Sequence, residues 1–286
     1  MLTVHNFSYG LLTPGLAYLM SVVGSFLGLR CTSRSQASSG KARVRWLLLG
    51  AGSIGITGIW VMHFIAMLGF TIPSETIHYS VPITLLSMLI SVAFVSIGLL
   101  IVGLSESMTL RSLLTGGVVT GLGVAAMHYS GMAAMRMPGR MSYGPGLFTL
   151  SIVIAIVAAT AALWFALRLG GFWSGFGAAL IMGVAVSGMH YTGMAAMRVY
   201  APDGSPMAMG GAEASAFLLP LIVGVSVTTF VLTASIALSP TAAEITEEAE
   251  LMRRIESLHA QPNGYIAPSG RKRDDDNPNF RPTLRQ

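Results

Sequence analysis

Three stretches of the sequence join a methionine, a histidine and an aromatic residue. Two of them, 121–136 (GLGVAAMHYSGMAAMR) and 183–198 (GVAVSGMHYTGMAAMR), align without a gap, and a more divergent third copy lies at 55–70 (GITGIWVMHFIAMLGF). Runs this similar within one chain are an internal repeat. Thioether sulfur is a soft ligand and imidazole an intermediate one, and together they suit copper, Cu(I) in particular, better than magnesium or calcium. The repeat therefore predicts a metal site.

Helical spacing decides which of these side chains can share that site. A histidine and the methionine four residues later lie on one face of a helix. The methionine just before the histidine lies about 100° around the helix, so it flanks that face. The predicted ligands are accordingly His63, His128 and His190, then Met67, Met132 and Met194, and beside them Met62, Met127 and Met189.

Other residues near the motifs are candidates for a supporting role. Tyr129 and Tyr191 follow two of the histidines and are candidates to contact a bound group. Trp60 stands one turn before His63, where it can form a wall of the site, and His5 is a candidate fourth ligand. A simpler interpretation stays open, because methionine fills cores and a histidine in lipid often only hydrogen-bonds to a neighbouring helix.

The elements that must position these residues are membrane helices. Hydrophobic residues make up 53% of the 286 residues and charged residues only 10%, against about 25% charged in ordinary soluble domains. Segments of about 20 apolar residues, enough to cross a bilayer, recur along the chain. We therefore predict an all-α membrane bundle of seven transmembrane helices, at about 9–29, 46–70, 81–104, 112–135, 147–169, 172–197 and 216–238.

The distribution of basic residues predicts how this bundle is oriented. With the N-terminus outside, fourteen of the 17 Lys and Arg residues lie on the inner side and only Arg136, Arg140 and Arg198 on the outer side. The positive-inside rule thus places the N-terminus outside and the C-terminus in the cytoplasm, and it explains the net charge of +5 without nucleic acid. The three motifs lie on even-numbered spans, so their histidines are expected at one depth near the outer face.

The distribution of apolar and charged residues divides the chain into two regions. Residues 1–240 form the membrane domain, and 241–286 a cytoplasmic tail with an amphipathic helix at 241–260 and disorder after it. Small residues accompany each motif, which permits close helix contact in lipid, so we expect the motif helices at the centre of the bundle. The single cysteine, Cys31, allows no intrachain disulfide and no thiolate cluster for a metal.

The motifs also carry a family resemblance. Met127-His128-Tyr129-Ser130 and Met189-His190-Tyr191-Thr192, with the variant Met62-His63-Phe64, resemble the MHYT family of bacterial integral membrane sensor domains. The resemblance covers roughly residues 5–240. It implies a multi-pass protein of the bacterial cytoplasmic (inner) membrane that binds copper near the outer face through Met, His and Tyr and senses a diatomic gas such as O₂, CO or NO. Phe64 replaces the tyrosine in the first copy, which removes a phenolic role there.

Many members of that family continue into cyclic di-GMP or kinase domains. This sequence contains no catalytic motif after Leu238. We therefore predict that the chain is not an enzyme and that it signals through a cytoplasmic partner, with a homodimer left open.

Two other functions fit part of the pattern. Methionine and histidine also suit a transporter for copper or another small solute, although the inner halves of the spans carry almost no polar residues to continue such a path. A b-type haem protein would use histidine pairs from facing helices. Here all three motif histidines are expected at one level rather than at two, which favours a metal ion over haem.

Overall fold

The computed structural model describes residues 3–73, 76–105, 107–137, 139–169, 171–201, 211–238 and 242–260. It contains two compact units, Met1–Leu238 and Ser239–Gln286. The predicted disordered segment after residue 260 lies outside the described residues. The first unit is an all-α membrane bundle with short strands at one end, which confirms the fold class at this level.

Helices occupy every predicted span. Within the described residues, six are long and apolar enough to cross a membrane: α1 (Leu12–Gln36), the continuous run of α2 (Gly40–Gly52), η1 (Ser53–Val61) and α3 (Met62–Leu68), then α4 (Val81–Gly103), α5 (Leu110–Ala133), α6 (Pro145–Arg168) and α7 (Phe172–Ala196). The next helix, α8 (Ala214–Leu238), contains Pro220, and its described apolar stretch is the shorter Ala216–Val231. The seventh predicted span is therefore a helix, but it is a weaker candidate for a membrane-crossing helix than the other six.

One continuous run forms the centre of the bundle. Almost every residue of η1 is buried, and α1, α4 and α8 pack against this segment. By contrast, α5 and α7 each keep a side that is free of protein contacts, as the exposed Leu122 and Val184 show. The expectation that all three motif helices are central is thus right for the first copy and wrong for the other two, which contact the centre along one face only.

Glycines and hydroxyls allow the central run to lie close to its neighbours. A Cβ atom added to Gly24 of α1 would lie 2.3 Å from the backbone nitrogen of Gly58 in η1. The Ser53 hydroxyl donates to the Gly24 carbonyl at 2.9 Å, and the Ser91 hydroxyl of α4 donates to the Gly55 carbonyl at 2.8 Å. The run is a π-helix at this place, a conformation that is frequently found at functional sites, and it leads directly into the helix that carries His63.

Gly24→Ala is expected to destabilise the bundle, because the new methyl group overlaps the backbone of η1. Overpacking of this kind typically costs about 1–3 kcal/mol. Gly15→Ala on the same helix is the matched control, since nothing lies within 4 Å of its added Cβ. Thermal unfolding of both purified variants in detergent checks the difference, and equal unfolding temperatures would contradict the packing described here.

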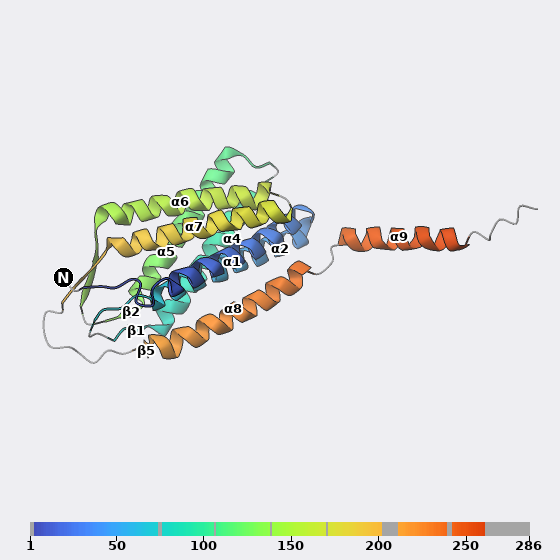
Figure 1. Cartoon of the computed structure of the whole chain (residues 1–286). Coiled ribbons are helices and arrows are strands. Elements are labelled where there is room, and N and C mark those ends of the chain that lie inside the picture. Colours follow the sequence, from blue (N-terminus) through green and yellow to red (C-terminus); the bar gives the residue numbers. More distant parts are fainter. Residues whose placement is uncertain are drawn as a thin grey trace, which may run out of the picture. The chain divides into compact units, whose positions relative to one another are not determined.

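Short strands cap the end of the bundle where the motif helices finish. The strands β1 (His78–Tyr79), β2 (Met135–Arg136) and β5 (Ala212–Glu213) form an antiparallel sheet in the order β2-β1-β5. The strands β3 (Arg140–Tyr143) and β4 (Met197–Tyr200) pair with Tyr143 opposite Met197. Figure 1 shows β1, β2 and β5 at the end of the bundle that also holds the N-terminus. We call it the strand end; helical periodicity did not predict these strands.

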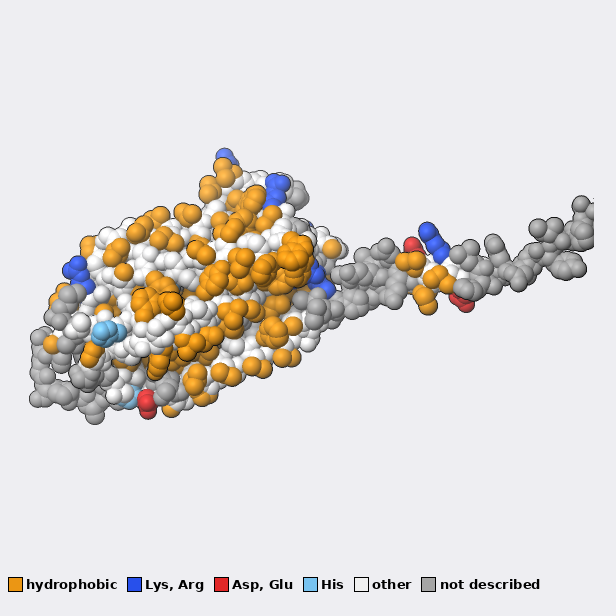
Figure 2. Space-filling model, in the orientation of Figure 1, with side chains coloured by type: hydrophobic (Ala, Val, Ile, Leu, Met, Phe, Trp, Pro, Cys, Tyr) orange, Lys and Arg blue, Asp and Glu red, His pale blue; other side chains and the backbone are white. Residues whose placement is uncertain are grey.

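The sides of the bundle suit a lipid environment. Large apolar side chains are exposed on several helices, including Leu89, Val157, Ile181 and Val223. In Figure 2 hydrophobic side chains cover the flank of the bundle, and Lys and Arg lie near the helix ends. Apolar surface this extensive is the mark of a membrane or partner contact. In the second unit, α9 (Ala242–Ala260) exposes Leu251, Met252 and Ile255.

Candidate metal centre

The three motif histidines meet in the core. His63 comes from α3, His128 from α5 and His190 from α7, and their side chains are at most 1% exposed. The Nδ1 atom of His63 lies 3.0 Å from that of His190 and 3.2 Å from that of His128. In the part of the chain that the structure describes, they are the only group of three or more His, Cys, Asp or Glu side chains near enough to share an ion.

The three imidazoles are arranged around a common centre. Their ring centroids are 5.0, 5.0 and 5.1 Å apart, and the ring planes meet at 82°, 80° and 89°. The rings therefore stand edge to face like the blades of a propeller. We refer to His63, His128 and His190 as the histidine triad.

Two glycines, each one turn after a triad histidine, lie against the Nε2 edge of another triad ring. A Cβ on Gly131 would lie 2.5 Å from Nε2 of His63, and a Cβ on Gly193 would lie 2.4 Å from Nε2 of His128. Each glycine follows a triad histidine by three residues, so α5 supports the histidine of α3, and α7 supports that of α5. The equivalent position of the first copy is Ala66, which is also buried. Sequence analysis assigned these glycines only to helix packing, although their constant spacing from the histidine was visible.

The nitrogen atoms suit a metal ion with one open position. An ion bound tetrahedrally by imidazole nitrogens at about 2.0 Å holds them about 3.3 Å apart. The two shortest Nδ1 pairs of the triad, at 3.0 and 3.2 Å, lie close to that value. All three Nε2 atoms are buried without a hydrogen-bond partner among the described residues. With hydrogens on Nε2, the three Nδ1 atoms would be free to accept a cation.

The predicted methionines lie in the same core. Met67, Met132 and Met194 are 2%, 0% and 4% exposed, and Met62, Met127 and Met189 are each 1% exposed. Met67 also lines a pocket at the strand end, and Met189 lines a small apolar pocket formed by α1, η1, α5, α6 and α7. Burial places six thioethers in the core that holds the triad, and their role as ligands stays a prediction.

The polar groups of two predicted supporting residues, Trp60 and Tyr129, face neighbouring helices. The Trp60 indole N–H faces α4, within 3.2 Å of the Thr84 carbonyl and 3.0 Å of the Ser87 hydroxyl, so Trp60 joins the central run to α4. The Tyr129 hydroxyl lies 2.6 Å from the Ser151 hydroxyl of α6. Both polar groups thus lie against a neighbouring helix, and the role of Trp60 and Tyr129 beside a bound group stays a prediction.

Tyr191 and His5 lie nearer the surface. The Tyr191 ring contacts Phe7, with centroids 5.4 Å apart, and its hydroxyl is buried without a partner among the described residues. His5 is exposed, and its backbone pairs with Thr71. The structure does not bring His5 to the triad, because this pairing fixes it at the strand end; the expectation of a fourth histidine ligand finds no support.

Comparisons with known proteins agree with the motif. The family model MHYT, described as "Bacterial signalling protein N terminal repeat", matches residues 57–116 and 121–179. These segments contain His63 and His128, and the third copy follows the second match. No solved structure matches the chain.

Curated relatives are larger signalling proteins. The chain is 39% identical over 194 residues to the bifunctional diguanylate cyclase/cyclic di-GMP phosphodiesterase MucR of Pseudomonas aeruginosa, covering 66% of the chain and 28% of the relative. It is 37% identical over 228 residues to the cyclic di-GMP phosphodiesterase NbdA of the same organism, covering 78% and 28%. The signaling protein YkoW of Bacillus subtilis is 33% identical over 204 residues, covering 67% and 25%. The chain thus spans about a quarter of the length of these relatives.

Proposed function

Because the chain belongs to the MHYT family of bacterial membrane signalling proteins, we propose that it is a sensor whose histidine triad binds a metal ion, copper before others. The convergence of three Nδ1 atoms in a fully buried site carries this proposal. Histidines inside a membrane domain are functional by default, because a polar group there is expensive to bury.

The donor set favours copper among the common metals. All three triad ligands are uncharged imidazoles, and the nearby predicted ligands are thioethers, which bind soft ions such as Cu(I). No carboxylate joins the cluster among the described residues. A singly charged ion needs less compensating charge in a low-dielectric core than a doubly charged one.

The chain's own residues prepare the site for a small ligand. Gly131 and Gly193 hold the rings of His63 and His128, so the Nδ1 atoms face inward, and the buried core excludes water. A copper ion on three nitrogens would supply an open fourth position for a diatomic gas such as O₂, CO or NO. Haem suits this geometry poorly, because a porphyrin has no room between nitrogens 3.0 to 3.2 Å apart.

The signal would pass through the helices that carry the triad. Each histidine belongs to a different helix, so a change in coordination shifts α3, α5 and α7 relative to one another. We take α8 as a seventh span, which places the strand end outside the bacterial inner membrane and the C-terminus in the cytoplasm. The exposed Leu251, Met252 and Ile255 of α9 would then offer a surface to a cytoplasmic signalling partner or a second copy of the chain.

Infrared spectroscopy under carbon monoxide tests the gas-binding part of this function. The purified chain, loaded with Cu(I) without oxygen, is expected to show one new C–O stretching band that shifts with ¹³CO. His128→Ala is expected to lose the band, and His5→Ala, which changes a histidine outside the triad, is expected to keep it. A chain that holds copper but gives no band would exclude the gas ligand while leaving the metal site intact.

A further inference from the structure

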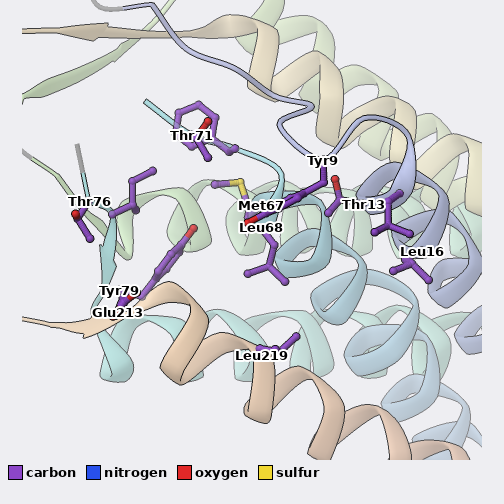
Figure 3. Close-up of a pocket in the computed structure, with 13 residues that line it drawn as sticks. Tyr9, Thr13, Leu16, Met67, Leu68, Thr71, Thr76, Tyr79, Glu213 and Leu219 are labelled. Atoms are coloured by element: carbon purple, nitrogen blue, oxygen red, sulfur yellow. The ribbon is translucent and has the colours of Figure 1, made fainter. Parts of the chain in front are cut away.

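A pocket of about 530 Å³ opens at the strand end, apart from the triad. Residues of α1, α3 and α8 and of the described stretches 70–73 and 76–79 surround it, as Figure 3 shows. Its volume is in the range of small-molecule sites, which are mostly apolar with a few placed polar groups. Its lining consists of Tyr9, Leu12, Thr13, Leu16, Met67, Leu68, Phe70, Thr71, Thr76, Ile77, Tyr79, Glu213 and Leu219.

Two hydroxyl groups of this pocket are placed to bond to a ligand, and one of them lacks a hydrogen-bond partner. Thr13 is 6% exposed, and its Oγ1 atom is buried without a partner among the described residues. Gly69 lies directly beside it, since a Cβ there would be within 2.4 Å of that oxygen. Tyr79 is 1% exposed and its hydroxyl points into the pocket in Figure 3. A sheltered hydroxyl without a partner is unfavourable, so Thr13 needs an acceptor. Tyr79 offers a second donor to the same pocket.

Tyr79 remains a hydrogen-bond donor at any physiological pH. Burial raises the pKa of its phenol well above the ordinary value. A ligand that fills this pocket therefore meets neutral O–H groups, which donate to carbonyl oxygens.

The remaining walls suit a flat ring with an apolar tail. Met67 and Phe70 are buried and provide a thioether and an aromatic face, both of which pack well against rings. Leu16 and Leu219 are 45% and 52% exposed, so the pocket continues onto apolar surface between α1 and α8. No Lys or Arg belongs to the described lining, so an anionic phospholipid headgroup would lack a counter-charge.

We propose that this pocket binds a membrane quinone, with its carbonyl oxygens on Thr13 and Tyr79, its ring against Met67 and its tail along Leu16 and Leu219. This occupant supplies the acceptor that Thr13 lacks, offers a second one to Tyr79 and needs no charged partner. Met67 and His63 lie one turn apart on α3, about 6 Å along the helix axis. A bound quinone would therefore contact the helix that carries the first triad histidine. The meaning of this contact for the triad rests on the proposed function. The binding of the quinone does not.

Calorimetric titration of the full chain in detergent micelles with decylubiquinone tests the proposal. Saturable binding is expected, and Tyr79→Phe and Thr13→Val are each expected to weaken it about tenfold, as the loss of one sheltered hydrogen bond does. Tyr143→Phe is the matched control, because it removes a phenol outside the pocket and is expected to leave the affinity unchanged. Decylbenzene, which has a ring and tail without carbonyl groups, is expected to bind at least tenfold more weakly than decylubiquinone.

The other outcomes overturn the proposal in distinct ways. Equal binding of decylbenzene would make the pocket a groove for any acyl chain, and unchanged affinity in both hydroxyl variants would remove the assigned contacts. Displacement of decylubiquinone by phospholipid at equal concentration would assign the pocket to lipid, and absence of saturable binding would leave no quinone site. Copper content of the same samples reports on the triad separately, and Tyr79→Phe is expected to leave it unchanged.

Discussion

Replacing His63, His128 and His190 together by alanine is expected to reduce bound copper from about one ion per chain to none. The three Nδ1 atoms lie together at 3.0 and 3.2 Å, and within the described residues no other cluster of His, Cys, Asp or Glu offers a substitute. His5→Ala is the matched control, because that histidine is exposed and lies outside the triad. Metal analysis after purification and dialysis measures both variants, and equal copper in the triple variant and the unchanged chain would refute the site.

Stability gives a second measure of the same site. A ligand that binds only the folded chain stabilises it by about 4.1 kcal/mol when its free concentration is a thousand times the Kd. Copper is therefore expected to raise the unfolding temperature of the unchanged chain and of His5→Ala. Copper is expected not to change the unfolding temperature of the triple alanine variant. A rise in all three would show that copper acts elsewhere on the protein.

The sequence was sufficient for the helices and for the triad, and physical reasons explain why. Apolar segments long enough for a bilayer leave few alternatives to a helix, because every backbone hydrogen bond must be satisfied within the segment. The repeat then placed His63, His128 and His190 on helices of the same direction, so equal depth followed from chain order. The structure adds what periodicity cannot give, namely that the three rings meet through Nδ1.

Side-chain direction was the part that sequence could not supply. Trp60 and Tyr129 stand beside the motif histidines in sequence, yet their polar groups hydrogen-bond to α4 and α6. A helix presents successive residues about 100° apart, so Tyr129, which directly follows His128, lies on a different face. Trp60 stands one turn before His63, and only the structure shows that its indole N–H faces α4. The strands were missed for another reason. A pair such as β1 and β2 is two residues long, too short for an alternating pattern to appear.

Two glycines of the motif differ in a way that only the structure reveals. Gly188 and Gly193 lie five residues apart on α7, and both appear in the sequence as small residues of a membrane helix. Their surroundings differ completely. Nothing lies within 4 Å of a Cβ added to Gly188, whereas a Cβ added to Gly193 would lie 2.4 Å from Nε2 of His128.

Gly193→Ala is consequently expected to lower copper affinity at least a hundredfold. Ordinary contact of a Cβ begins at 3.4 Å, so the imidazole of His128 must move by about 1 Å or rotate away from the other two rings. Functional constellations tolerate displacements of only about 0.5 Å. Competition titration of Cu(I) against a chelator of known affinity measures the change.

Gly188→Ala is the control for helix composition and for folding. The same substitution in the same helix adds a methyl group to an exposed position, and alanine favours a helix over glycine by about 1 kcal/mol. Its copper affinity is expected to equal that of the unchanged chain, and its stability to be equal or higher. Elution of Gly193→Ala as a folded protein with weak copper binding would locate the defect at the His128 ring. Full copper affinity in Gly193→Ala would instead show that Nε2 of His128 does not rest on this glycine, and the propeller arrangement of the triad would have to be abandoned.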